Sequence, residues 1–156
     1  MQLAELISVE RIACGVDTAS KKRALEHISE LICTAAPTLN PTEVFESLIA
    51  REKLGSTGLG KGVAIPHGRL KSGEDTIVAF LQLSKGVDFD SPDGQPVDLL
   101  CALMVPPEST DEHLQILAQL SEIFRQADLR EKLREAKNPQ ELCGILVQSS
   151  ATTHSE

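Results

Sequence analysis

The sequence predicts an α/β fold in which helices cover both faces of a small sheet. Segments of helical and strand-like periodicity alternate along the chain, and two strand-like segments are almost continuously apolar. Strands of that kind are covered on both faces. The length of 156 residues fits one compact domain, expected over residues 1–147, with a disordered polar tail over residues 148–156.

The first half of the chain predicts two helices and then a strand. Apolar residues recur at helical spacing between residues 20 and 35, and Ser20 is the expected N-cap. A second helix is expected to begin after Asn40, which caps a proline in the first helical position, and to end before Gly55. The short apolar run 62–65 then predicts a strand.

The second half predicts two further strands followed by three helices. The two long apolar runs, 76–83 and 97–105, predict the strands that are buried on both faces. A capping box at 109–112 predicts the start of a helix. A short helix near 128–136 and a last helix over 139–147 complete the expected fold.

Composition and charge exclude several classes of protein. A net charge of -8 argues against nucleic acid as the main partner, since that binding depends on clustered Lys and Arg. Aromatic residues make up 3%, with no Trp or Tyr, so stacking surfaces for bases are nearly absent. No apolar run approaches the roughly 20 residues of a membrane helix, and the N-terminal residues do not form a secretory signal. We therefore expect a cytoplasmic protein without membrane insertion.

Positive charge is concentrated in one stretch, residues 51–71. Five basic residues stand there against Glu52 alone, which makes the stretch +4 in a protein of net charge -8. Such a stretch attracts an anion, although a solvated basic loop is the alternative.

Glycines and hydroxyl residues open this basic stretch. The run from Gly55 to Lys61 matches the start of a phosphate-binding P-loop, but Gly62 stands where a magnesium-binding hydroxyl is needed. The loop also leads from a helix into a strand, the reverse of the P-loop order. The remaining hypothesis is an oxyanion cradle of backbone N–H groups with the hydroxyls of Ser56 and Thr57, and the alternative is a flexible surface turn.

The segment AIPHG follows the expected strand 62–65. Pro66 lacks an N–H group and is expected to end the strand, and Gly68 allows a ligand or partner to approach the backbone. His67 is thereby presented just beyond a strand end, where α/β proteins place functional residues. A neutral imidazole is a competent nucleophile or general base near pH 7.

A second histidine, His113, lies in the first turn of the helix that follows strand 97–105. If that strand pairs with 62–65, His67 and His113 face the same end of the sheet. A helix N-terminus disfavours imidazolium and favours an incoming anion. A plain helix-surface histidine is the alternative.

Three segments together carry a family resemblance: REKLGSTGLGKGVAIPHGRL, DSPDGQPVDLLCALMVPPE and HLQILAQLSEIF. With them the chain resembles the IIA domains of the mannitol/fructose class of the bacterial phosphotransferase system, and within that class the nitrogen-regulatory IIA proteins. The resemblance implies a mixed sheet of about five strands flanked by helices, and phosphorylation of His67 on Nε2. It also implies supporting roles for Arg51 and His113, and we expect Ser56, Thr57 and Gly68 to bind the phosphate.

The resemblance further implies the partners. The phosphoryl donor would be a histidine-containing phosphocarrier protein, and the output would be regulation of proteins such as potassium transport components or sensor kinases. No cofactor and no metal are expected. A IIA component that passes phosphate to a sugar-specific IIB is the first alternative. A metal-dependent hydrolase with His67 and His113 as ligands, and a binding module that only recognises an anion, also remain open.

Overall fold

The computed structural model describes residues 2–109 and 111–154, and in that part of the chain six strands form one mixed sheet. The strands are β1 (Ile12–Val16), β2 (Gly58–Gly60), β3 (Val63–Ala64), β4 (His67–Arg69), β5 (Ile77–Val87) and β6 (Val97–Val105). Their order is β1-β5-β6-β3-β2, and β4 also pairs with β6. The predicted α/β class with a small mixed sheet is confirmed.

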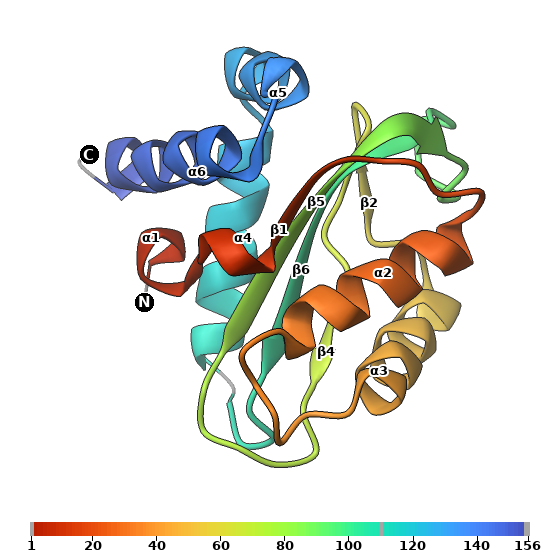
Figure 1. Cartoon of the computed structure of the whole chain (residues 1–156), viewed down its shortest axis with the longest axis vertical. Coiled ribbons are helices and arrows are strands. Elements are labelled where there is room, and N and C mark those ends of the chain that lie inside the picture. Colours follow the sequence, from red (N-terminus) through yellow and green to blue (C-terminus); the bar gives the residue numbers. More distant parts are fainter. Residues whose placement is uncertain (1, 110, 155–156) are drawn as a thin grey trace.

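Helices cover both faces of this sheet, as expected (Figure 1). One face carries α2 (Lys21–Cys33) and α3 (Pro41–Leu54). The other carries α1 (Leu3–Leu6), α4 (Asp111–Phe124), α5 (Ala127–Glu135) and α6 (Pro139–His154). A short 3₁₀ turn, Val9–Arg11, leads into β1. The caps predicted for α2 and α3 form: the Ser20 side chain accepts from Arg23 N, and that of Asn40 from Thr42 N.

The two faces explain the continuous apolar runs. Along β6, Leu99, Cys101 and Leu103 pack against the α4–α6 layer, whereas Leu100 and Ala102 pack against α2 and α3. Both faces of the strand are therefore covered from Leu99 to Val105, and its one polar residue, Asp98, lies near its start, where it pairs with Arg134. β6 pairs antiparallel with β5 and parallel with both β3 and β4.

β3 and β4 are two halves of one interrupted strand, which reconciles about five expected strands with six observed. Val63 pairs with Leu99 and His67 with Leu103, so the register on β6 is the same before and after the interruption. Pro66 has no N–H to offer, but its carbonyl accepts from Leu103 N at 2.9 Å. The expectation that His67 lies beyond the strand end is thus wrong: pairing resumes at His67 itself.

The structure differs from the expected fold mainly at the two ends of the chain. Residues 148–154 are helical and continue α6, whereas a disordered tail was expected there; residues 155–156 lie outside the described part. Ser150 is buried and its Oγ accepts from Ala4 N at 3.2 Å, so α1 gives the last turns of α6 something to pack against. The sequence did not predict α1 or β1, which are too short for a periodic signal.

Two further findings concern individual expectations. The capping box predicted at 109–112 depends on residue 110 and on the side chain of Glu112, which lie outside the described residues. Within residues 2–109 and 111–154, no helix has the length and apolar character needed to cross a membrane.

Candidate functional site

His67 lies on β4, a strand that is reached by side chains from the helices on both faces of the sheet. It pairs with Leu103, a residue of the α4-side core, and α3 packs against β4 from the other layer. Arg51 reaches His67 from α3, and His113 reaches it from α4. The prediction that His67 and His113 share one end of the sheet is confirmed, because their ring centroids are 5.4 Å apart with an interplanar angle of 75°.

Hydrogen bonds determine which nitrogen of His67 carries the proton. Nδ1 lies 2.9 Å from the Ile65 carbonyl oxygen, which can only accept. Nε2 lies 3.2 Å from Nε of Arg51, which can only donate. The neutral ring therefore has its proton on Nδ1 and its lone pair on Nε2, and a cation lies beside that lone pair.

The same surroundings keep this imidazole uncharged. Burial lowers the pKa of His67 below its ordinary value, and the guanidinium of Arg51 lowers it further. The hydrogen bond to Ile65 and the charge of Glu52 raise the pKa, but burial is the largest single effect and the net shift is downward. His67 is consequently neutral at pH 7, with Nε2 available as a nucleophile or acceptor.

The surroundings of His113 also favour its neutral form. Burial lowers its pKa, and His67 and Arg69 lower it further. Its Nδ1 is buried without a hydrogen-bond partner among the described residues. Arg69 also donates to the carbonyl oxygens of Pro106, Pro107 and Ser109, which ties the segment before α4 to β4.

The turn at residues 55–58 does not have the contacts expected of an oxyanion cradle. Thr57 is 5% exposed, and both its N–H and its hydroxyl donate to the carboxylate of Glu52. The hydroxyl of Ser56 donates to the Phe89 carbonyl and accepts from the N–H of Gly58. Phosphate binding by Ser56 and Thr57 stays a prediction, and their present contacts weigh against it.

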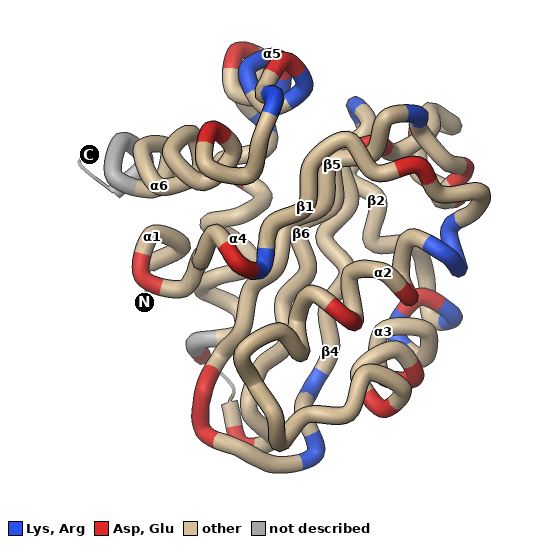
Figure 2. Tube along the Cα trace, viewed as in Figure 1, with Lys and Arg blue, Asp and Glu red and all other residues tan. Residues whose placement is uncertain are grey.

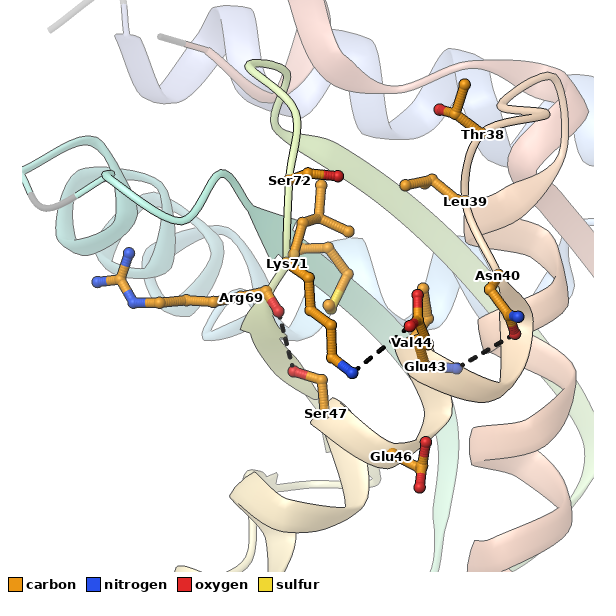
Figure 3. A pocket seen from close by; sticks show the side chains of 12 residues that line it. Thr38, Leu39, Asn40, Glu43, Val44, Glu46, Ser47, Arg69, Lys71 and Ser72 are labelled. Carbon is orange, nitrogen blue, oxygen red and sulfur yellow. Dashed lines mark hydrogen bonds and ion pairs between the residues drawn. The ribbon is translucent and has the colours of Figure 1, made fainter.

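The glycine after His67 has a packing role. A side chain on Gly68 would collide with Ser47 of α3, whose hydroxyl donates to the Arg69 carbonyl (Figure 3). Phosphate binding by Gly68 likewise stays a prediction. The pocket drawn in that figure, about 380 Å³, lies between the start of α3 and the end of β4 and is not lined by His67 or His113.

The basic stretch is divided by the fold into parts with different surroundings. Arg51 and Arg69 lie at the histidine pair. Lys71 pairs with Glu43 at 3.4 Å, and Lys61 lies in the β2–β3 turn at the far end of β3 from His67. Figure 2 shows the basic residues of β4 and of the following turn in blue near the acidic residues of α3. Charge counting therefore located the site but overstated its positive charge.

Sequence reasoning missed Ile65 and Glu52. The only available signal was that Glu52 is the single acid among five bases between residues 51 and 71. In the described part of the chain no group of three or more His, Cys, Asp and Glu side chains is arranged to hold a metal ion.

Comparisons with known proteins place this geometry in a family. Residues 5–149 match the family described as "Phosphoenolpyruvate-dependent sugar phosphotransferase system, EIIA 2". A nitrogen regulatory protein of Pseudomonas aeruginosa is 44% identical over 94% of this chain and 96% of its own length. A fructose-specific EIIA component of Haloferax volcanii is 35% identical over 92% of this chain and 90% of its own.

A solved structure agrees in fold as well as in sequence. The crystal structure of nitrogen regulatory protein IIA-Ntr from Neisseria meningitidis has a TM-score of 0.86 and 42% identity, covering 92% of this chain and 98% of that one. The chain therefore belongs to the EIIA 2 family of the phosphoenolpyruvate-dependent sugar phosphotransferase system.

Proposed function

We propose that the protein is a regulatory phosphoryl acceptor, phosphorylated on Nε2 of His67 by a histidine-containing phosphocarrier protein. One observation carries the proposal: the Ile65 carbonyl and Arg51 hold the neutral ring with its lone pair on Nε2. That nitrogen is unprotonated at pH 7 and needs no general base before it attacks.

The transfer step follows from this arrangement. The Nε2 lone pair of His67 attacks phosphorus, the P–N bond of the donor breaks, and the donor nitrogen keeps the electron pair. As the new bond forms, Arg51 exchanges its hydrogen bond from Nε2 to a phosphoryl oxygen. The Nδ1 proton stays on the ring, where the Ile65 carbonyl stabilises the positive charge that develops.

His113 is the second supporting side chain in this proposal. Its ring lies edge-on to His67 at a centroid distance of 5.4 Å, close enough for its side chain to reach an oxygen on a phosphorylated His67. Arg69 keeps His113 in place by holding the segment 106–109.

A regulatory output is supported by the relatives named nitrogen regulatory protein, of which one is 44% identical. Potassium transport components or sensor kinases stay the expected targets, and a cytoplasmic location stays the expected one. Onward transfer to a sugar-specific IIB is the second candidate, supported by the fructose-specific relative. Mixing the phosphorylated chain with a fructose-type IIB separates them: regulation predicts that the phosphoryl group remains on this chain.

Arg51 also bears on the other two alternatives. The guanidinium beside Nε2 of His67 would repel a metal cation there but attract a phosphoryl group, which disfavours the metal-dependent hydrolase. A module that only recognises an anion would have no need of a neutral nucleophile and would never acquire a covalent phosphoryl group.

The test is incubation with phosphoenolpyruvate and the upstream phosphocarriers, followed by intact mass. The chain should gain about 80 Da, the mass of one added phosphoryl group. The adduct should be lost in acid and kept in mild base, as a phosphoramidate requires. No adduct, or an acid-stable one, would end the proposal.

A further inference from the structure

Glu52 is a buried carboxylate beside the site that the transfer step does not use. Its side chain is 4% exposed, and Nζ of Lys21 lies 3.0 Å from Oε1. Oε1 also accepts from the N–H of Thr57 at 3.1 Å, and Oε2 accepts from its hydroxyl. A buried charge persists only with such partners, so Glu52 is committed to Lys21 and to the turn at Thr57.

From Thr57 a continuous series of hydrogen bonds leads to the imidazole. The Thr57 carbonyl accepts from the N–H of Ile65 at 3.1 Å, and the Ile65 carbonyl accepts from Nδ1 of His67 at 2.9 Å. Ile65 is thus bonded to the turn through its N–H group and to the imidazole through its carbonyl. Each bond in this series has one possible direction.

A second connection joins the same turn to the other ring nitrogen. Nη1 of Arg51 donates to the Gly55 carbonyl at 2.8 Å, while Nε of the same guanidinium donates to Nε2 of His67. The N–H of Gly55 in turn donates to the backbone carbonyl of Glu52 at 3.1 Å. Both groups that orient His67 therefore depend on the position of residues 55–57.

We propose that Glu52 is a positioning residue for His67: with Lys21 and Thr57 it anchors the 55–57 turn, and the turn orients both ring nitrogens. The charge of Glu52 raises the pKa of His67 through space, but the orientation of the ring depends on Glu52 only through Thr57, Ile65 and Arg51. The inference deepens the proposed function and rests on it for the catalytic readout, but not for the orientation of the ring.

A purely structural role for Glu52 makes a different prediction. A buried ion pair that only holds α2 against α3 would change stability when broken, with the His67 tautomer and the rate per folded molecule unaffected. Positioning requires both to change together. Thr57→Val allows the distinction to be drawn, because it removes the hydrogen bond to Glu52 Oε2 and leaves the ion pair between Lys21 and Glu52 in place.

The experiment compares Glu52→Gln, Thr57→Val and Thr57→Ser with the wild-type chain, with Glu46→Gln on the exposed face of α3 as the matched control. Nitrogen-15 NMR of labelled histidine reports the His67 tautomer without any phosphoryl donor. The rate of phosphoryl acceptance is measured against the concentration of phosphorylated phosphocarrier protein, which separates donor binding from the rate at saturation.

For the wild-type chain and Glu46→Gln we expect a single tautomer with the proton on Nδ1. Glu52→Gln and Thr57→Val should give a tautomer mixture and lower the saturating rate about tenfold, with the half-saturating donor concentration unchanged. Thr57→Ser, which keeps the hydroxyl, should restore both readouts.

A wild-type tautomer in both Glu52→Gln and Thr57→Val would overturn the inference. If Glu52→Gln does not fold, Thr57→Val decides alone, because it leaves the Glu52 carboxylate paired with Lys21. If even the wild-type chain accepts no phosphoryl group, the proposed function fails, and the tautomer measurement still decides whether Glu52 positions the ring.

Discussion

Two polar clusters in this protein differ in charge and in how completely their hydrogen bonds are made within the protein. The His67 cluster, made of Arg51, His67 and His113, is half-buried and holds a cation against a neutral ring. The Gln82 cluster lies under α5, where the side chain of Gln82 is 6% exposed and uncharged. All four hydrogen bonds of its amide are made within the protein, to the residues Cys14, Gly15, Leu133 and Ala136.

The contrast separates groups whose hydrogen bonds are all made within the fold from groups that have capacity left for a ligand. The amide of Gln82 joins β1 and β5 to the end of α5 and has no capacity left for a ligand. In the His67 cluster, one hydrogen bond to Nε2 can be exchanged, and Nδ1 of His113 has no partner among residues 2–109 and 111–154. Changes in the Gln82 cluster should affect stability, and changes in the His67 cluster should affect the proposed phosphoryl transfer.

The largest expected effect is that of His67→Ala. It should abolish the phosphoryl adduct, because the nucleophilic nitrogen is gone, and should change the unfolding free energy less than a change at Gln82 does. Intact mass and urea denaturation measure the two quantities. His27→Ala on α2 is the matched control, and equal labelling of the wild-type and His67→Ala chains would contradict the assignment.

Removal of the Arg51 guanidinium should have the second largest effect on phosphoryl transfer. Arg51→Ala should slow phosphoryl transfer by about 10²–10³-fold, the usual effect of losing one preorganised donor to a developing negative charge. Arg51→Lys should recover only part of the rate, since an ammonium cannot bond the Gly55 carbonyl and the reacting groups through one planar fork. A wild-type rate in Arg51→Ala, in quenched time courses at saturating donor, would remove Arg51 from the mechanism.

Gln82→Leu tests the other side of the comparison. It keeps the volume but removes the Gln82 bonds of the Leu133 carbonyl and the Gly15 N–H, and it leaves the Ala136 carbonyl with the Cys14 thiol alone of its two side-chain donors. We expect a loss of about 2–4 kcal/mol in the free energy of unfolding, with the transfer rate per folded molecule unchanged. Gln140→Leu on the exposed side of α6 should change stability far less. A slower rate in folded Gln82→Leu would show that the clusters are coupled.

The smallest expected effect is on pH dependence. Because burial and Arg51 hold the folded pKa of His67 below its ordinary value of about 6.5, the midpoint of the decline in transfer with falling pH should lie below 6.5, as protonation takes the Nε2 lone pair. The free energy of unfolding should also fall as the pH falls. The His67 ring of the unfolded chain is protonated at a higher pH than that of the folded chain, so stability decreases from about pH 6.5 towards the folded pKa. Arg51→Ala should move the decline to higher pH, and NMR titration of His67 checks it.

The sequence predicted the parts of this fold that have a periodic or capping signal. The α2 and α3 helices, strand β6 and the shared end for His67 and His113 all followed from apolar spacing and from Pro and Gly positions. A disordered tail is predicted from residue 148, whereas the structure continues α6 to His154. Ser150 there accepts from Ala4 N, a contact between distant residues that no local pattern reveals.

The site was predicted to a similar extent. Arg51 and His113 do meet His67, but the hydroxyls of Ser56 and Thr57 are engaged inside the protein. The residue type shows that a side chain can donate a hydrogen bond. Tertiary structure decides whether a group within the protein already accepts that bond. The carbonyl of Ile65 could not be found from sequence at all, because every residue has one.

The position of β4 bears on the tendency of the protein to aggregate. One edge of β4 pairs with β6, and among the described strands no other pairs with it, so its second edge would invite a strand from another chain. Ser47 of α3 donates to the Arg69 carbonyl on that strand, and Gly68 lets the helix come close enough to do so. The helix that carries Arg51 thus also covers part of the free backbone edge of β4, which leaves less of that edge open to pairing with a strand of another chain.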